Sequence, residues 1–191
     1  MKKYRDYYFQ QAKKEDYRAR SVYKLKEIDE KFRLIKPGMK VLDLGCAPGS
    51  WLQYCLEKVG DKGKVVGFDI TEVKPVPRGA KVIQADVFQL KPEDIEDRPF
   101  DCVLSDMAPS TTGAKSVDHF RSVELCRKAF DIAGKTLKTG GSFVCKIFQG
   151  EDFEVFVKEV KIRFESVKIF KPTSSRSESK EIFIIAKGFM K

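Results

Sequence analysis

Apolar residues fall along the chain in short runs that alternate with longer segments of helical periodicity. The runs have the length of strands and are nearly continuous, as in parallel strands buried on both faces. They predict strands at 40–44, 64–69, 81–84, 101–105, 141–147, 166–170 and 181–186. Helices are predicted at 21–32, with Ser21 as N-cap, and at 49–59, 116–137 and 152–163. This alternation is typical of an α/β fold with a mostly parallel sheet and helices on both faces.

Positive charge is concentrated before the first predicted strand. Of 191 residues with a net charge of +9, residues 1–40 hold thirteen Lys/Arg against six Asp/Glu, and the remainder is nearly neutral. A basic arm on a near-neutral body indicates a surface for a polyanion, most often nucleic acid, although it also suits a merely soluble surface. The turn at Lys36-Pro37-Gly38 divides the chain into an arm with its helix, 1–36, and a main part, 37–191. The length suffices for one structural domain overall.

Several classes of protein are disfavoured by what the chain contains. The apolar runs stay far below the ~20 residues of a membrane span, and no apolar segment follows the basic start, so we expect a cytoplasmic protein. Five cysteines, at 46, 55, 102, 126 and 145, show no CxxC spacing, and His119 is the single histidine. We therefore expect neither a metal site nor disulfides.

The first predicted strand ends in DLGCAPGSW, residues 43–51, and a helix follows directly. Glycine in such a strand–turn–helix unit lets a ligand approach the backbone closely, which makes Gly45 and the neighbouring Asp43 candidate cofactor contacts. The segment is not GxGxxG, so it suits S-adenosylmethionine better than a dinucleotide. The alternative is a tight turn without a ligand.

Two further acids stand at strand ends. Asp69 closes the second strand, where a ribose diol would be bound, and Asp86 follows the third, within reach of an adenine amino group. Either acid alone is commonly a helix cap. Because the carboxyl ends of parallel strands meet at one edge of a sheet, Asp43, Asp69 and Asp86 together predict a nucleoside site there.

A lysine inside the apolar run 144–148 is the main chemical oddity of the sequence. Lys146 would be buried, and a buried lysine requires a partner. Asp106 ends the adjacent predicted strand and is the leading candidate. The alternative to a catalytic pair is a structural ion pair at a strand end. Four phenylalanines are expected to be mostly core, with the lining of an RNA groove as the alternative: Phe120, Phe148, Phe153 and Phe156.

Five segments resemble the FtsJ/RrmJ (RlmE) ribosomal RNA 2′-O-methyltransferases. They are RSVYKL at 20–25, DLGCAPGSW at 43–51, LSDMAP at 104–109, KIFQG at 146–150 and SESKE at 177–181. The resemblance runs from about residue 20 to residue 186 in the same order. Ser50 stands where many relatives have a second glycine, and Cys46 replaces a commoner alanine. Both substitutions are small and leave the cofactor expectation unchanged.

The resemblance implies a Rossmann-like, seven-stranded methyltransferase sheet and S-adenosylmethionine as methyl donor. A Lys-Asp-Lys-Glu catalytic tetrad would fall on Lys24, Asp106, Lys146 and Glu181. Cofactor contacts would fall on Gly49, Trp51, Asp69, Asp86 and Asp106. A lysine can deprotonate a ribose 2′-hydroxyl only if its pKa falls from about 10.4 toward ~7–8. We therefore interpret Lys146 as general base, Asp106 as its orienter, and Lys24 and Glu181 as supports.

The basic arm then has a partner, RNA, with the large ribosomal subunit favoured. Residues expected to meet phosphates are Lys2, Lys3, Arg5, Lys13, Lys14, Arg18 and Arg20, continued by Arg176 and Lys180 of the polar loop 171–180. Tyr4, Tyr7, Tyr8 and Tyr17 are available for base stacking. The resemblance favours a uridine of large-subunit (23S-type) ribosomal RNA. We also expect a monomer. Three alternatives stay open: a tRNA 2′-O-methyltransferase, a non-catalytic RNA-binding assembly factor and an NAD-dependent oxidoreductase.

Overall fold

The computed structural model describes residues 2–76, 79–110, 112–176 and 179–191. The strands are β1 (Lys40–Leu44), β2 (Lys64–Asp69), β3 (Lys81–Gln84), β4 (Phe100–Ser105), β5 (Leu137–Phe148), β6 (Phe164–Phe170) and β7 (Glu181–Phe189). The helices are α1 (Lys2–Lys14), α2 (Val22–Phe32), α3 (Ser50–Val59), α4 (Lys115–Thr136) and α5 (Phe153–Arg163), with a 3-10 turn, η1, at Pro92–Asp94. No helix among these residues is both long and apolar enough to span a membrane.

The strands form one seven-stranded sheet in the order β3-β2-β1-β4-β5-β7-β6. Neighbours from β3 to β5 are parallel, whereas β7 runs antiparallel to both β5 and β6. The predicted fold class, a mostly parallel Rossmann-like sheet, is thereby confirmed. Chain order reverses between β1 and β4, and ligands of open α/β sheets bind beyond the carboxyl ends of the strands at such a point.

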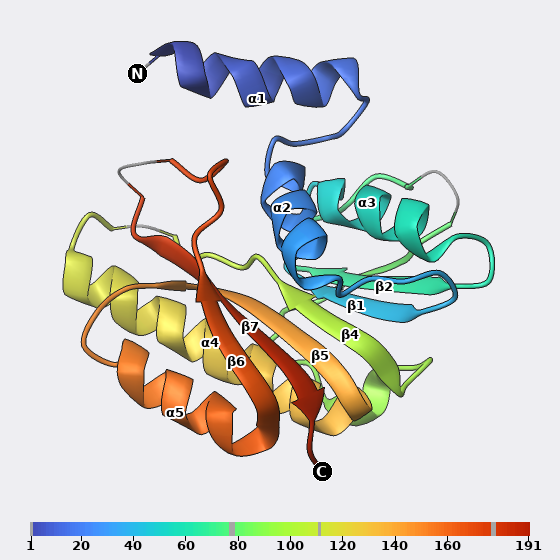
Figure 1. The fold of residues 1–191 in the computed structure, drawn as a ribbon, viewed down its shortest axis with the longest axis vertical. Coiled ribbons are helices and arrows are strands. Elements are labelled where there is room, and N and C mark those ends of the chain that lie inside the picture. The colour runs from blue at the N-terminus through green and yellow to red at the C-terminus, as the bar shows by residue number, and fades with distance from the viewer. Residues whose placement is uncertain (1, 77–78, 111, 177–178) are drawn as a thin grey trace.

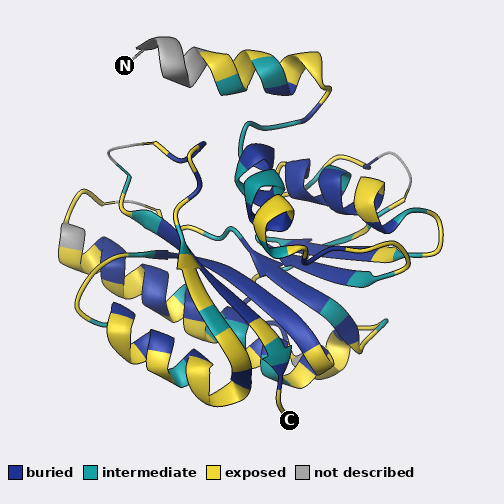
Figure 2. Cartoon of the chain, in the orientation of Figure 1, coloured by how far each residue is buried: buried dark blue, intermediate teal, exposed yellow. Residues whose placement is uncertain are grey.

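Helices cover both faces of this sheet (Figure 1). On one face α4 and α5 bury the larger cluster, which includes Phe100, Phe143 and Phe156. On the other face α2 and α3 bury a second cluster around Leu25 and Leu52. The central strands are therefore enclosed on both sides, as Figure 2 shows in dark blue, and this enclosure explains their continuous apolar runs.

Most predicted elements are present, and the differences have simple causes. The bounds of β1, β2 and β3 are those predicted. β5 begins at Leu137, earlier than predicted, because the polar stretch 138–141 extends the strand past a pairing irregularity opposite Phe100 and Cys102. β6 and β7 also extend beyond their apolar centres.

The basic arm, for which no helix was predicted, contains α1. Its sequence has a weak apolar stripe, but Ala12 is buried and the Tyr8 ring lies 5.2 Å from the ring of Tyr23 on α2. In Figure 1, α1 runs across the top of the molecule, above α2. Contacts with α2 thus stabilise α1 as a helix, although the hydrophobic pattern of its sequence did not predict one.

The four questioned phenylalanines divide between core and surface. Phe153 and Phe156 are buried in the α4–α5 cluster, as expected. Phe148 is half-buried, and Phe120 is 53% exposed on α4. All five cysteines are buried with free thiols. Of the four phenylalanines expected to lie mostly in the core, two are therefore core residues.

Candidate active site

A cavity of about 530 Å³ opens beyond the carboxyl ends of β1, β2 and β4, at the point where chain order reverses. Its lining includes the predicted cofactor residues Gly45, Asp69, Asp86 and Asp106, together with Met107. Of the three acids expected to converge, Asp69 and Asp86 line this cavity and Asp43 does not, whereas Asp106 lines it as well. The volume is of the order expected for a small-molecule site.

Glycine is required where the turn after β1 passes the cavity. Gly45 has φ +79, and a Cβ there would lie 2.3 Å from Met107 Cγ. Gly49 has φ +106 and precedes α3, where a Cβ would lie 2.9 Å from Arg18 Nη1. The Arg18 guanidinium donates to the carbonyl oxygens of Pro48 and Lys74, at 3.1 and 2.7 Å, and so joins the turn to a neighbouring loop.

Asp69 and Asp86 shape the cavity wall through the backbone. Asp69 accepts hydrogen bonds from the amides of Ala47 and Thr71, both at 2.8 Å. Asp86 accepts one from the amide of Phe88 at 2.9 Å. A carboxylate has about four acceptor positions, so each retains capacity for hydroxyl or amino donors of a ligand. These contacts fit the predicted ribose and adenine contacts without testing them.

Asp43 lies beneath the same region and is fully buried on β1. Neither of its carboxylate oxygens has a hydrogen-bond partner among the described residues. Burial, with smaller contributions from the charges of Asp106 and Asp69, raises the pKa of Asp43 well above its ordinary value. A ligand that brings positive charge and donors would offset this cost, which fits S-adenosylmethionine with its sulfonium and amino groups.

Trp51 and Gly49 do not line the cavity. The Trp51 indole is 3% exposed and donates from Nε1 to the carbonyl oxygen of Ser21 at 2.9 Å. Ser21 is the N-cap residue of α2, as predicted, but its hydroxyl lies 3.0 Å from Ser50 Oγ and makes no capping hydrogen bond. Instead, this group of contacts holds the start of α2 against the start of α3.

Lys146 and Asp106 form the predicted ion pair. Lys146 Nζ lies 2.9 Å from Asp106 Oδ1 and donates to the Asp106 backbone oxygen at 2.6 Å. The side chains are 7% and 16% exposed. β4 and β5 are neighbours, with Ser105 paired to Cys145, so the two residues follow directly from strand register. The predicted need of Lys146 for an acidic partner is confirmed.

Lys24 and Glu181 form a second pair beside the first. Lys24 Nζ lies 2.7 Å from Glu181 Oε1, with both side chains 13% exposed. Burial opposes ionisation of Glu181, but Lys24, and at longer range Lys146, outweigh it, so the pKa of Glu181 lies below its ordinary value. The four side chains thus alternate in charge from Asp106 through Lys146 and Glu181 to Lys24. The structure brings the whole predicted tetrad together, and the role of each member stays a prediction.

Helix α4 holds the strand that carries Lys146. Cys126 Sγ donates to the Lys146 carbonyl oxygen at 3.0 Å, and the Phe148 amide donates to Ser122 Oγ at 3.1 Å. His119 Nδ1 lies 3.0 Å from the Phe148 carbonyl oxygen. These three α4 residues are spaced three and four apart, so one helix face follows the end of β5. The sequence reasoning missed this role, although the helical spacing contains it.

Glu27 was also missed, and it links α2 to the loop before β7. Its carboxylate accepts hydrogen bonds from the amides of Thr173 and Ser174, at 2.6 and 2.8 Å, and from the Thr173 hydroxyl at 2.8 Å. Lys24 lies one helical turn before Glu27, so the same helix supports the pair with Glu181 and the loop that leads to it. Nothing in the sequence distinguishes Glu27 from a solvated helix acid.

A second hollow, of about 420 Å³, lies beside the tetrad. Its lining is Arg20, Ser21, Lys24, Arg176, Ser179 and Glu181. Arg20 donates to the Ser174 carbonyl oxygen at 2.9 Å while it lines this hollow. Three cations around one opening suit a phosphate. Four predicted RNA contacts lie outside the described side chains: Lys2, Lys3, Tyr4 and Arg5. Ser177 and Glu178 of the last motif also lie outside the described residues.

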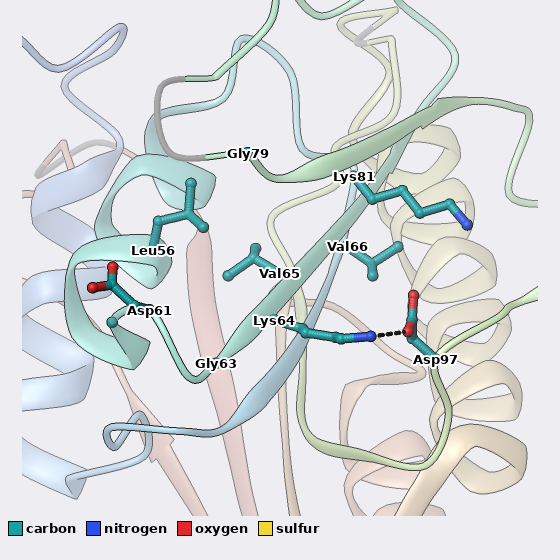
Figure 3. A pocket seen from close by; sticks show the side chains of 10 residues that line it. Leu56, Asp61, Gly63, Lys64, Val65, Val66, Gly79, Lys81 and Asp97 are labelled. Carbon is teal, nitrogen blue, oxygen red and sulfur yellow. Dashed lines mark hydrogen bonds and ion pairs between the residues drawn. The ribbon is translucent and has the colours of Figure 1, made fainter.

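A further hollow, of about 260 Å³, lies at the opposite edge of the sheet, where β2 and β3 begin (Figure 3). Lys64 pairs there with Asp97 at 2.7 Å, and Lys81 pairs with Glu96. None of the predicted site residues lines it. The sheet therefore has chemically distinct edges, and the cofactor cavity and the tetrad share the carboxyl one.

Fold and site together define an α/β methyltransferase dependent on S-adenosylmethionine. The model of the FtsJ-like methyltransferase family matches residues 17–189, and the chain belongs to this family. It is similar to "Ribosomal RNA large subunit methyltransferase E" of Oleidesulfovibrio alaskensis, 54% identical over 99% of this chain and 94% of the relative. The protein of the same name from Desulfatibacillum aliphaticivorans is 51% identical over 95% and 89%.

Solved structures agree with this assignment. A protein from Plasmodium falciparum, described as a ribosomal RNA methyltransferase, superposes with a TM-score of 0.81 at 31% identity, covering 91% of this chain and 98% of that one. A SAM-dependent O-methyltransferase from Thermotoga maritima superposes with a TM-score of 0.60 at 14% identity, covering 87% and 64%, and shows the fold alone.

Proposed function

We propose that this enzyme transfers a methyl group from S-adenosylmethionine to a ribose 2′-hydroxyl of large-subunit ribosomal RNA, with a uridine as the favoured target. The observation that carries the proposal is the buried Lys146–Asp106 pair, which lies between a cavity suited to the cofactor and a cationic hollow suited to RNA. The names of relatives about half identical to this chain support the substrate.

The chain's own groups supply the proton transfer. A 2′-hydroxyl is a weak nucleophile and must lose its proton as its oxygen bonds to the methyl carbon. Lys146 Nζ, in its neutral form, accepts that proton, and Asp106 holds the amine toward the hydroxyl and stabilises the ammonium that results. Glu181, held by its ion pair with Lys24, acts on Lys146 through its charge at longer range. In-line placement of the reacting atoms supplies much of the remaining acceleration.

Residues of the first cavity would hold the cofactor. Asp69 and Asp86 would bind the ribose and adenine, while Asp43 would offset positive charge. Gly45, Gly49 and Trp51 belong to the turn and helix start that would meet the amino acid end. When bound, S-adenosylmethionine supplies a methyl carbon made electrophilic by its sulfonium.

The RNA surface continues from the cationic hollow onto the arm. Residues 1–36 would form this RNA-facing part of one structural domain, and 37–191 its catalytic part. The exposed Tyr7 ring on α1 is available for stacking on a base, whereas the Arg18 guanidinium is engaged by backbone carbonyls. The favoured target suits a protein that acts in the cytoplasm, where ribosomal subunits are assembled, and we propose that it acts there as a monomer.

The experiment is transfer of labelled methyl from S-adenosylmethionine by wild type, Lys146→Ala and the control Lys64→Ala. Substrates are large ribosomal subunits, free ribosomal RNA and bulk tRNA, all from cells that lack the modification. We expect label in the large subunit, reduced ~10³-fold or more by Lys146→Ala and unchanged by Lys64→Ala. Label confined to tRNA would overturn the substrate. Cofactor binding without transfer to any RNA would overturn the enzyme and favour a binding role.

A further inference from the structure

The carboxyl edge has a third space besides the cofactor cavity and the cationic hollow lined by Arg20, Lys24 and Arg176: a hollow of about 190 Å³, called the third hollow below. Its lining is Asp118, His119, Phe148, Gln149, Ser179 and Lys180. Phe148 pairs with Glu181 across β5 and β7, and Lys146 lies two residues before Phe148, on the same face of the strand. The hollow is therefore adjacent to the two strands that carry Lys146 and Glu181.

The two hollows beside the tetrad differ in chemistry. Ser179 lines both, so they lie next to each other, but Arg20, Lys24 and Arg176 belong to the cationic one alone. A nucleotide presents phosphates and a base on different sides of its ribose. The cationic hollow suits the phosphate, which leaves the third hollow for what is attached at the other side of the sugar.

Two of the three charged or titratable side chains of the third hollow, Asp118 and His119, are already engaged, and the third is Lys180. Asp118 accepts hydrogen bonds from the amides of Thr112 and Gly113, at 2.7 and 3.2 Å, and these bonds lower its pKa. His119 Nε2 accepts a hydrogen bond from the Asp152 amide at 3.0 Å, which leaves the ring proton on Nδ1 for the Phe148 carbonyl oxygen. With one lysine beside one carboxylate, this wall is less suited to an anion than the cationic hollow, which has three cations and one carboxylate.

What the hollow does offer is the Gln149 amide, next to the lining residue Phe148. Phe148 is half-buried, and Gln149 is exposed, with no side-chain hydrogen bond among the described residues. The Gln149 backbone amide donates to the Lys180 carbonyl oxygen at 3.1 Å, which fixes its position. An amide side chain can donate to and accept from the hydrogen-bonding edge of an unstacked base, as in RNA-binding proteins.

The size of the hollow agrees with this chemistry. At ~30 Å³ for each water, the hollow of about 190 Å³ has room for about six waters. This volume suits a base with a single ring and is smaller than a whole nucleotide. Gly150 forms part of the reason, because a Cβ there would lie 2.4 Å from His119 Cγ, so the ring packs directly against the backbone after Gln149.

We propose that the third hollow receives the base of the nucleotide that is methylated, and that the Gln149 amide hydrogen-bonds an edge of that base and helps to select it. The proposal rests on the proposed function. It assigns the base to the α4 side of the tetrad and the phosphate to the α2 side. Gln149 is then a specificity-determining residue, distinct from the groups that move the proton.

The test uses reconstituted large subunits that carry each of the four bases at the methylated position, once that position is mapped. Rates of methyl transfer are compared for wild type, Gln149→Ala, Gln149→Glu and the matched variant Arg176→Ala. We expect wild type to methylate one base faster than the other three. In Gln149→Ala, the ratio of the rate for that base to the rates for the others should fall about tenfold. Gln149→Glu exchanges donors for acceptors and should penalise a base edge that presents a carbonyl. Arg176→Ala should slow all four equally and weaken the salt dependence.

Each other outcome decides against the pocket. An unchanged preference in both Gln149 variants overturns it, as does narrowing by Arg176→Ala instead. A variant that merely folds poorly slows all four bases and keeps the ratio, so the ratio reports recognition, and binding of S-adenosylmethionine checks the fold. If wild type methylates no subunit, the proposed function fails as well, whereas transfer without base preference overturns the pocket alone.

Discussion

Lysine–carboxylate pairs occur at both edges of the sheet, and the two sets differ in their distance from water. At the amino edge, where β2 and β3 begin, they are Lys64–Asp97 and Lys81–Glu96. At the carboxyl edge they are Lys146–Asp106 and Lys24–Glu181. The separations are similar, 2.7 Å for Lys64–Asp97 and 2.9 Å for Lys146–Asp106. Pairing as such therefore does not distinguish a catalytic group from an ordinary surface.

Burial does distinguish them. The Lys64 side chain is 58% exposed, whereas that of Lys146 is 7% exposed. Water screens an exposed pair, which contributes little, and the loss of one partner is tolerated. A withdrawn pair interacts strongly, and removal of one partner leaves an uncompensated charge. A lysine can therefore take part in catalysis where the sheet and helix α2 exclude water, and the following variants test this dependence on burial.

The largest effect beyond Lys146 itself is expected from Glu181→Gln. The variant leaves Lys24, 13% exposed, without its counter-charge and removes an anion that acts on Lys146 at longer range, so kcat/KM should fall ~10- to 100-fold. Glu96→Gln, the same change in an exposed pair, should stay within about twofold. Because the pKa of Glu181 is lowered, the pair is ionised above the ordinary value near 4.3 and is lost only as pH falls below it.

The loss in Glu181→Gln should therefore be constant from about pH 6 to pH 9, measured as initial rates of methyl transfer. Wild-type rates in Glu181→Gln would show that burial does not separate the two edges. If the difference in rate between wild type and Glu181→Gln disappeared within this pH range, Glu181 would be titrating there. That result would contradict its ionisation by pairing with Lys24.

Asp43→Asn should change stability more than any exposed pair does. Burial raises the pKa of Asp43, so the native state holds its proton at pH values where the unfolded chain, with a pKa near 3.9, has released it. The contribution of this bound proton to the free energy of unfolding is fully present below the unfolded-state pKa and decreases as pH rises above it. An asparagine has no such cost, and each kcal/mol gained raises Tm by ~2–4 °C for a chain of this size.

Thermal unfolding of the ligand-free protein at pH 4 and pH 8 measures this effect. Asp43→Asn should unfold at a higher temperature than wild type at pH 8, and the difference should shrink at pH 4. Added S-adenosylmethionine should reverse the order, because the variant no longer offsets positive charge. Equal Tm values at pH 8 would contradict the assignment of Asp43 as an unpaired buried acid.

The same contrast explains what the sequence could predict. The run around Lys146 and the acids at strand ends identify the cofactor edge, because parallel strands bring their carboxyl ends together whatever the loops do. Asp106 follows from strand adjacency. The Lys24–Glu181 pair does not, since its members are 157 positions apart in the sequence and meet only after α2 has docked. Only the resemblance to a known family named them.

Residues whose role is set by loop geometry were beyond sequence reasoning. Glu27 has the spacing of a solvated helix acid, yet it accepts three hydrogen bonds from Thr173 and Ser174. Trp51 stands in a recognised motif, but its indole is turned toward Ser21 rather than into the cavity. Helix α1 lacks a strong apolar stripe and depends on contacts such as Tyr8 with Tyr23. Each depends on where a distant segment lies, which local pattern does not encode.

The smallest effect is expected at the amino edge, and it completes the comparison. A double-mutant cycle of Lys64→Ala and Asp97→Ala should give a coupling of ~0.2–1 kcal/mol in the free energy of unfolding, because water and salt screen the pair. The coupling should decrease in 1 M NaCl, where the Debye length is about 3 Å. Methyl transfer should be unchanged in all three variants. A larger coupling that salt does not reduce, or a loss of methyl transfer, would mean that this edge is also shielded from water. Solvent exposure would then no longer explain why Lys146, and not Lys64, acts in catalysis.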